Sequence, residues 1–450
     1  MKKIMYFLAA GLFLASCSRD VSDDTTQGAV EGRSNVFHFS QSDLDGMLTQ
    51  MNQSFNVSAK AATQLNYTYR AYAEPVTIPG HTMAASAIFA IDDMVFVTWH
   101  SNAGPVVAGA SSSLSGSICA YKLSGIGQYT FTDRVDFSDA DYHEVTAHRN
   151  SLEGNIEVFA VGQRNVAQSG YLLNGHNGAV VTRIDYDYIN DEFNETSVKE
   201  LPLPGVSAND IVAGAAHLYC VTGDGEGGSD GAVYEFDRSM SQVKKVNNSI
   251  NDGQAIVADE TTQTSSASDL YILDRVGADR YRIHSMSTSL AGDNTTWASS
   301  VNFVSDLSGV TAIDDERADL TWAQHAAGAS DPSDSLIVSF GFNGIYRAGT
   351  GANGMTNVKN IGPCLSTAYD ANLAVLYYAD GDDGVSVLAM EDFEGGALIS
   401  TYDIIGQFAP PTGGIFPASF LIKEMTIYQT RHMALAAAEA GVYFIQRDKI

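Results

Sequence analysis

The sequence predicts an all-β fold, and two observations support this prediction. Beyond about residue 62 no segment keeps the 3.6-residue hydrophobic period of a helix, whereas short apolar or alternating runs recur with Gly, Asp and Asn between them. The composition agrees, since 41 Gly, 21 Tyr and 20 Phe with only 10 Pro are typical of a turn-rich protein with aromatic strand positions. With 450 residues, 45% of them hydrophobic, the chain can bury a large core.

The first 16 residues are predicted to be a secretory signal peptide. Lys2 and Lys3 precede an apolar stretch over residues 4–14, which is too short to cross the ~30 Å hydrocarbon layer of a membrane as a helix. The next residues complete the motif Leu-Ala-Ser-Cys, which ends at Cys17 and resembles the lipobox of bacterial lipoproteins. This resemblance implies cleavage before Cys17 and a lipid anchor on its thiol. The alternative is an ordinary cleavage site beside a chance cysteine.

A short acidic run after the lipobox bears on location. Ser18 stands where lipoproteins of the inner membrane commonly have Asp, so the resemblance implies the outer membrane. The run from Ser18 to Asp24 resembles the export tag that carries some Gram-negative lipoproteins to the cell exterior, although a solvated linker has the same composition. We expect residues 17–62 to form a flexible acidic tether with one short helix near residues 42–51. Trimming the chain to residue 60 is therefore expected to be harmless.

The remaining chain, residues 63–450, contains a repeated pattern. An apolar strand, a polar or Gly-rich loop and a strand with Tyr or a β-branched residue recur about every 57 residues. The first strands of the seven copies begin at Val95, Ile156, Leu218, Leu270, Leu336, Leu376 and Leu435. Small-residue runs such as 84–91 and 206–213 precede the copies and suit the narrow inner end of a radial blade. The sequence therefore predicts a seven-bladed β-propeller.

The last copy carries a resemblance to a known class of propellers. The run from Leu435 to Ile445, which closes on Gly-Val-Tyr-Phe-Ile, resembles the degenerate blades of bacterial propellers of the LVIVD type. The resemblance implies the fold and carries no function with it. Tandem β-sandwiches and a parallel β-helix are the alternative folds, and the long period disfavours the β-helix.

The seventh copy runs out of chain, which predicts how the ring closes. It supplies three strands, and only four residues follow Gln446. Before the first blade lies the alternating run from Leu65 to Tyr72, which has no other obvious partner. We predict that this run pairs with residues 441–446 as the outer strand of the seventh blade and covers an otherwise open edge.

Candidate ligand-binding residues lie in the loops that would face one end of the central channel. Trp99 and His100 follow the first predicted second strand, where an aromatic ring beside polar groups suits the recognition of a sugar, although Trp99 could equally pack on a neighbouring blade. Four further candidates could line the channel, either as hydrogen-bonded groups or as acid and base groups: His143, Glu144, His148 and Asp210. Asp252 is expected to extend them as part of a ring of carboxylates.

Two acidic, glycine-rich loops are candidate Ca²⁺ sites. Their carboxylates alternate with glycines, as a hard cation requires, and these are Asp224, Glu226, Asp230, Asp380 and Asp382. Hairpin turns that need positive φ angles explain the same residues. Calcium is the one cofactor that the sequence suggests.

Charge and missing motifs limit the function. The chain has 25 Lys and Arg against 53 Asp and Glu, a formal charge of −28, which excludes nucleic acid as a default partner. It contains no nucleophile elbow, zincin helix or phosphate-binding glycine loop. We therefore expect a non-catalytic binding or scaffold propeller for a glycan or protein partner. The alternative is a polysaccharide hydrolase or lyase that uses carboxylates and His from separate blades.

Overall fold

The computed structural model describes most of the chain beyond residue 29. The described residues are 30–31, 36–39, 41–57, 65–78, 81–101, 114–125, 127–164, 178–214, 216–224, 231–246, 250–258, 267–277, 279–289, 301–308, 318–323, 336–348, 354–359, 364–370, 372–373, 375–389 and 404–448. The signal peptide, Cys17 and the acidic run therefore lie outside them. No helix in the described part is long and apolar enough to cross a membrane.

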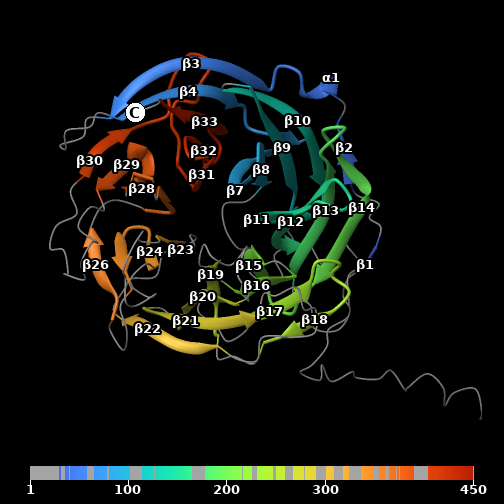
Figure 1. The fold of residues 1–450 in the computed structure, drawn as a ribbon, viewed down its shortest axis with the longest axis vertical. Coiled ribbons are helices and arrows are strands. Elements are labelled where there is room, and N and C mark those ends of the chain that lie inside the picture. The colour runs from blue at the N-terminus through green and yellow to red at the C-terminus, as the bar shows by residue number, and fades with distance from the viewer. Residues whose placement is uncertain are drawn as a thin grey trace, which may run out of the picture.

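The fold is an all-β, seven-bladed propeller (Figure 1). Seven antiparallel sheets of the described residues surround a central axis, and we number the blades in chain order of their innermost strands. Blade 1 contains β7 (Ala84–Ile91), β8 (Met94–His100), β9 (Gly116–Ser124) and β10 (Gln128–Phe137). Blade 2 contains β11 (Ala140–Asn150), β12 (Asn155–Arg164), β13 (Ala179–Asp187) and β14 (Glu192–Pro202). Blade 3 contains β15 (Ser207–Ala213), β16 (His217–Gly223), β17 (Ala232–Asp237) and β18 (Val243–Lys245).

Blades 4 to 6 repeat the same order with shorter strands. Blade 4 contains β19 (Gly253–Ala258), β20 (Ala267–Arg275), β21 (Arg280–Ser289) and β22 (Asn302–Ser308). Blade 5 contains β23 (Asp319–Trp322), β24 (Leu336–Ser339), β25 (Ile345–Arg347) and β26 (Thr356–Lys359). Blade 6 contains β27 (Thr367–Asp370), β28 (Val375–Ala379), β29 (Val385–Ala389) and β30 (Ile404–Phe408), with a short turn of 3₁₀ helix, η2 (Gly381–Asp383), before β29. A small ribbon of β5 (Thr77–Ile78) and β6 (His81–Thr82) precedes blade 1.

Blade 7 closes the ring with strands from both ends of the chain. Its inner strands are β31 (Glu424–Tyr428), β32 (His432–Ala436) and β33 (Val442–Arg447), and its outer strands are β4 (Leu65–Ala73) and β3 (Leu48–Val57). β4 pairs antiparallel with β33, so that Tyr72 lies opposite Tyr443. The predicted closure is confirmed, and Figure 1 shows β4 beside β33 at the rim.

The expected tether is wrong over residues 30–57. β1 (Val30–Glu31) adds to the outer edge of blade 2, β2 (Val36–His38) adds to that of blade 1, and β3 follows on blade 7 (Figure 1). We call these three strands the N-terminal belt. The expected helix near residues 42–51 is only the single turn α1 (Gln41–Leu44), because Gly46 takes a φ of 90° and the chain then extends into β3.

The hydrophobic core consists of seven clusters among the described residues, one between each pair of neighbouring blades. Cys119, Cys220 and Cys364 are buried in three of them as free thiols. The strands of each blade alternate in direction, so every innermost strand begins at the same face of the propeller. We call this the entry face, and we call the opposite one, where each first strand turns into its second, the hairpin face.

Candidate functional site

Four carboxylates lie at one level on the innermost strands, and we call them the carboxylate ring. They are Glu144 on β11, Asp210 on β15, Asp319 on β23 and Glu424 on β31. All four are half-buried, and the residue that follows each is apolar and buried in the core. Because side chains alternate along a strand, this pattern turns the carboxylates out of the core.

The ring carboxylates connect neighbouring innermost strands. Oε2 of Glu424 accepts a hydrogen bond of 3.0 Å from the backbone N–H of Ile88 in blade 1. Oδ2 of Asp210 accepts one of 2.7 Å from the N–H of Ile256 in blade 4. An innermost strand has no further strand on its axis side, so these carboxylates satisfy backbone donors that would otherwise lack a protein partner.

The carboxylates of the ring act on one another electrostatically. Burial raises the pKa of Glu144 well above its ordinary value, and the charges of Glu424, Asp210 and Asp319 raise it further. Burial also raises the pKa of Glu424, with Asp319 and Asp210 adding to the effect, and it raises the pKa of Asp319. Burial is the largest cause in each case, and for Glu144 and Glu424 the neighbouring carboxylates follow. The ring therefore favours either bound protons or a cationic group.

Replacing Glu424 by Gln is expected to stabilise the protein as the pH rises. Because folding raises the pKa of Glu424, the native state binds a proton more tightly than the unfolded state, and stability is lost as the pH rises towards the raised pKa. Gln keeps an acceptor for Ile88 without a charge. We expect a gain on the order of 1 kcal/mol at pH 8 and none below about pH 4, measured by urea unfolding.

The matched control for this variant is Glu192→Gln, at an exposed position on the outer strand β14. It should change the unfolding free energy equally little at both pH values. Destabilisation of Glu424→Gln at pH 8, or an equal effect at pH 4, would contradict the electrostatic account of the ring.

Trp99 is not an exposed sugar platform. Its side chain is fully buried at the end of β8 and belongs to the core cluster between blades 7 and 1, with Cys119 and Tyr121. The prediction that Trp99 is an exposed sugar-binding residue is therefore wrong, and the alternative, that it packs against a neighbouring blade, is correct. Burying the large indole surface favours this placement.

His100 and His143 do approach one another at the entry face. Their ring centroids are 6.0 Å apart in an edge-on arrangement, although they come from blades 1 and 2. Nδ1 of His100 lies 3.9 Å from Oδ1 of Asp141, a fully buried carboxylate at the start of β11. Since His143 directly precedes Glu144, this imidazole pair adjoins the carboxylate ring.

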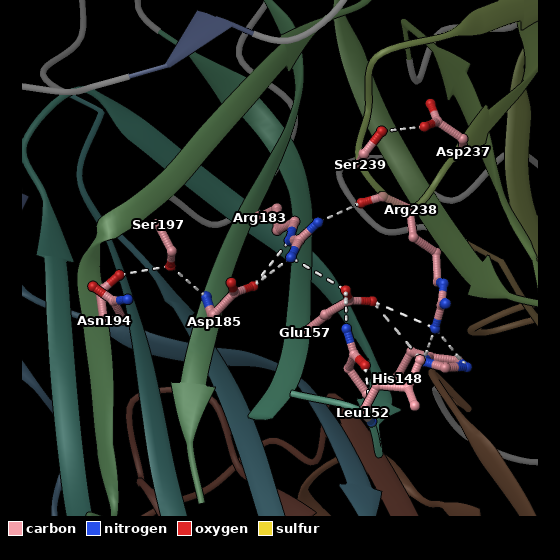
Figure 2. Close-up of polar contacts among 11 residues, drawn as sticks. His148, Leu152, Glu157, Arg183, Asp185, Asn194, Ser197, Asp237, Arg238 and Ser239 are labelled. Atoms are coloured by element: carbon pink, nitrogen blue, oxygen red, sulfur yellow. Dashed lines mark hydrogen bonds and ion pairs between the residues drawn. The ribbon is translucent and has the colours of Figure 1, made fainter. Parts of the chain in front are cut away.

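His148 belongs to a different cluster, at the hairpin face (Figure 2). Its Nδ1 lies 3.9 Å from Oε2 of Glu157, and the Arg238 guanidinium contacts its ring. Burial lowers the pKa of His148 to about 4, and Arg238 contributes to this effect. His148 is thus neutral near pH 7 and is turned towards Glu157, at the opposite end of β11 from His143.

The cluster around His148 joins blades 2 and 3. Glu157 is only 3% exposed and lies 3.2 Å from Arg183 and 3.6 Å from Arg238. Nη1 of Arg183 donates to the carbonyl of Arg238 at 2.8 Å, across the blade boundary, as Figure 2 shows. Asn150 also donates a hydrogen bond to the Glu157 carboxylate. The contacts of Arg238 with His148, Glu157 and Arg183 all cross from blade 3 to blade 2. The cluster therefore fastens the two blades together.

Asp252 is not part of the carboxylate ring. It is fully buried ahead of β19, where its N–H donates to Oδ1 of Asp274 at 2.9 Å. In blade 4 the level of the ring is occupied by Ala255, the residue before Ile256, so Asp252 lies three residues too early. Asp319 and Glu424, which the sequence analysis missed, complete the ring instead. Their signal was an acidic residue directly before an apolar one at the start of each innermost strand.

The acidic glycine loops are described in part. Glu226 and Asp230 lie outside the described residues, and Asp224 is the last described residue before them. In blade 6, Oδ2 of Asp380 accepts a hydrogen bond of 2.9 Å from Ser386, and Gly381 and Gly384 take φ angles of 54° and 101°. Asp382 lies within η2 between them. Within the described part of the chain, no three His, Cys, Asp or Glu residues are placed to hold a metal ion.

Comparison with known proteins adds little beyond the fold. No protein-family model and no curated protein matches this sequence. Among solved structures, Raptor from Chaetomium thermophilum is similar over 82% of this chain and 28% of its own, with a TM-score of 0.49 and 7% identity. The chain thus spans less than a third of that protein, and this likeness carries no argument about function.

Proposed function

We propose that this protein is a non-catalytic binding platform, anchored by a lipid on Cys17 in the outer membrane and facing the cell exterior, that holds a glycan or protein partner at its entry face. The observation that carries the proposal is the carboxylate ring, whose members raise one another's pKa, beside the His100–His143 pair. Carboxylates that disfavour one another's charge favour a partner that presents a basic or hydroxyl-rich group. The burial of Trp99 removes the aromatic surface on which a sugar would stack, so a protein partner with Lys or Arg is favoured over a neutral glycan.

A binding screen tests this proposal. The purified protein is presented to surface extracts and polysaccharides, and retained partners are compared between wild type and the double variant Glu144→Gln/Glu424→Gln. Loss of the partner in the double variant, with retention in Glu192→Gln, supports the entry face as the site. Equal retention by both variants would contradict it.

A polysaccharide hydrolase or lyase is the second candidate, because one observation favours it. A carboxyl group with a raised pKa is what a general acid requires, and burial together with the neighbouring carboxylates raises the pKa of Glu144. Release of oligosaccharides by the wild type and its loss in Glu144→Gln would establish an enzyme. Binding without any product release supports the platform.

Replacing Cys17 by Ala is expected to remove the protein from membranes. Once the signal peptide is cleaved, acyl chains on Cys17 would be the only anchor of the proposed lipoprotein, at ~0.8 kcal/mol per buried CH₂. Fractionation should therefore find the variant in the soluble fraction, and protease treatment of intact cells should degrade only the wild type at the surface. Recovery of the variant in the membrane fraction would overturn the lipid anchor.

A further inference from the structure

A small pocket between blades 6 and 7 combines buried donors with excess positive charge. It lies at the hairpin face, where β27 and β33 end and β31 turns into β32, and it is partly open to solvent. Its lining includes Tyr67, Asp370, Tyr377, Arg431 and Arg447. It is thus at the opposite face from His100 and His143 and independent of the proposed function.

One nitrogen of the Arg447 guanidinium has no hydrogen-bond partner among the described residues. The side chain is 8% exposed, its Nη1 donates to Oδ2 of Asp370 at 2.7 Å, and its Nη2 donates to the carbonyl of Thr430 at 2.9 Å. Its Nε is buried and has no hydrogen-bond partner among the described residues. A buried N–H group of a charged side chain that lacks an acceptor is costly, so an acceptor from outside the chain would be favourable there.

A tyrosine pair supplies a second donor. The hydroxyls of Tyr67 and Tyr377 are 2.7 Å apart, and both residues are at most 2% exposed. The pair has two hydroxyl hydrogens, and only one of them can serve the bond between the two oxygens. The other hydrogen is available to an acceptor in the pocket. The pocket therefore offers two donors of different origin to one small ligand.

The net charge of the pocket favours a ligand with one negative charge. Asp370 neutralises Arg447, whereas the half-buried Arg431 has no ion pair or side-chain hydrogen bond with any described residue. His432, which also lines the pocket, is neutral near pH 7, because burial together with Arg431 and Arg70 lowers its pKa to about 4. One uncompensated positive charge remains, in a chain whose formal charge is −28.

We infer that this pocket binds the carboxylate group of a small organic acid or of a uronic acid sugar. One carboxylate oxygen accepts from Nε of Arg447, the other accepts from the tyrosine pair, and Arg431 supplies the charge. A carboxylate has the two acceptor oxygens and the single charge that the pocket matches, whereas phosphate near neutral pH carries more charge than Arg431 balances. The open mouth leaves room for the rest of a sugar outside.

The test is a calorimetric titration of the full-length protein at constant ionic strength. Sodium acetate, sodium glucuronate, glucose and inorganic phosphate are titrated separately into wild type and Arg431→Gln. We expect saturable binding of acetate and glucuronate, at least tenfold weaker binding in Arg431→Gln, and no binding of glucose. Tighter binding of glucuronate than of acetate would identify a sugar acid as the preferred ligand. Tighter binding of acetate would identify a simple organic acid.

Two further variants make the result specific. Arg447→Lys keeps the charge beside Asp370 but removes Nε, so its carboxylate affinity should also fall while its melting temperature reports that it folds. Arg149→Gln makes the same charge change on the hairpin face of blade 2, where Arg149 pairs with the exposed Asp92, and it should bind like wild type. Absence of carboxylate binding to wild type, meaning that only water fills the pocket, would overturn the inference. So would phosphate binding as tightly as acetate, or an equal loss in Arg149→Gln.

Discussion

A chain that begins at residue 80 is expected to lose the folded propeller, whereas one that begins at residue 30 should melt like the wild type. The shorter chain lacks β4, which brings Tyr67, Tyr69 and Tyr72 into the clusters around blade 7, each of them at most 2% exposed. Burying a large apolar side chain is worth ~1.5–3 kcal/mol, so three of them approach the ~5–15 kcal/mol that stabilises a domain. The open edge of β33 would also invite aggregation.

A chain that begins at residue 60 separates the closing strand from the belt. It keeps β4 but loses β3, whose Phe55 stacks on Tyr67 with ring centroids 5.4 Å apart and whose Val57 is fully buried. An intermediate melting temperature is therefore expected, which replaces the sequence-based expectation that this trimming is harmless. Circular dichroism of the three chains measures the order. Equal melting of the chains from residues 30 and 80 would show that β4 is not needed for closure.

Replacing Arg164 by Met is expected to destabilise the protein by ~3–5 kcal/mol. Arg164 lies at the end of β12 and donates from Nε and Nη2 to Oδ2 of Asp139, at 3.1 and 3.0 Å, while its Nη1 pairs with Glu200. Both carboxylates are at most 1% exposed, so the variant would leave two buried negative charges without the guanidinium that compensates them.

The pH dependence and a surface control distinguish this mechanism from lost packing. The loss in Arg164→Met should shrink as the pH falls, because a buried carboxylate that has lost its counter-charge is less costly once it is protonated. Arg149→Met breaks an ion pair that is about half exposed on both sides and should cost no more than ~1 kcal/mol. Denaturant unfolding at pH 5 and pH 8 provides both comparisons. A loss in Arg164→Met that does not vary with pH would assign it to packing.

The blades were predictable because each one carries its own signal. The predicted pairs of second and third strands all fall on observed strands, and the closing strand followed from counting those of blade 7. The belt gave no such signal. β3 is mostly half-buried or exposed, and its Gln, Asn, Ser and Thr residues read as a linker although its backbone completes a sheet edge. Edge strands of this kind depend on the neighbouring sheet rather than on their own hydrophobicity.

The carboxylate ring was predictable only in part, since it depends on closure. Glu144 and Asp210 lie on neighbouring blades and could be grouped from the sequence, whereas Glu424 comes near them only because blade 7 meets blade 1. The position of each ring carboxylate along its strand also depends on β-bulges, such as the one between Tyr142 and Glu144. A bulge shifts a strand by one residue and leaves no clear trace in the composition. The burial of Trp99 likewise depends on which blade lies beside it.

The N-terminal belt has a mechanical consequence if the chain is anchored at Cys17, as we propose. Twelve residues lie between Cys17 and β1, a leash that spans no more than ~45 Å when fully extended. Tension along that leash meets β1 first and then β2 and β3 in chain order, each on a different blade. Pulling at the leash would therefore peel three outer strands in succession before any load reaches β4. The belt strands would detach one after another, and their detachment would protect β4, the strand that keeps the ring closed.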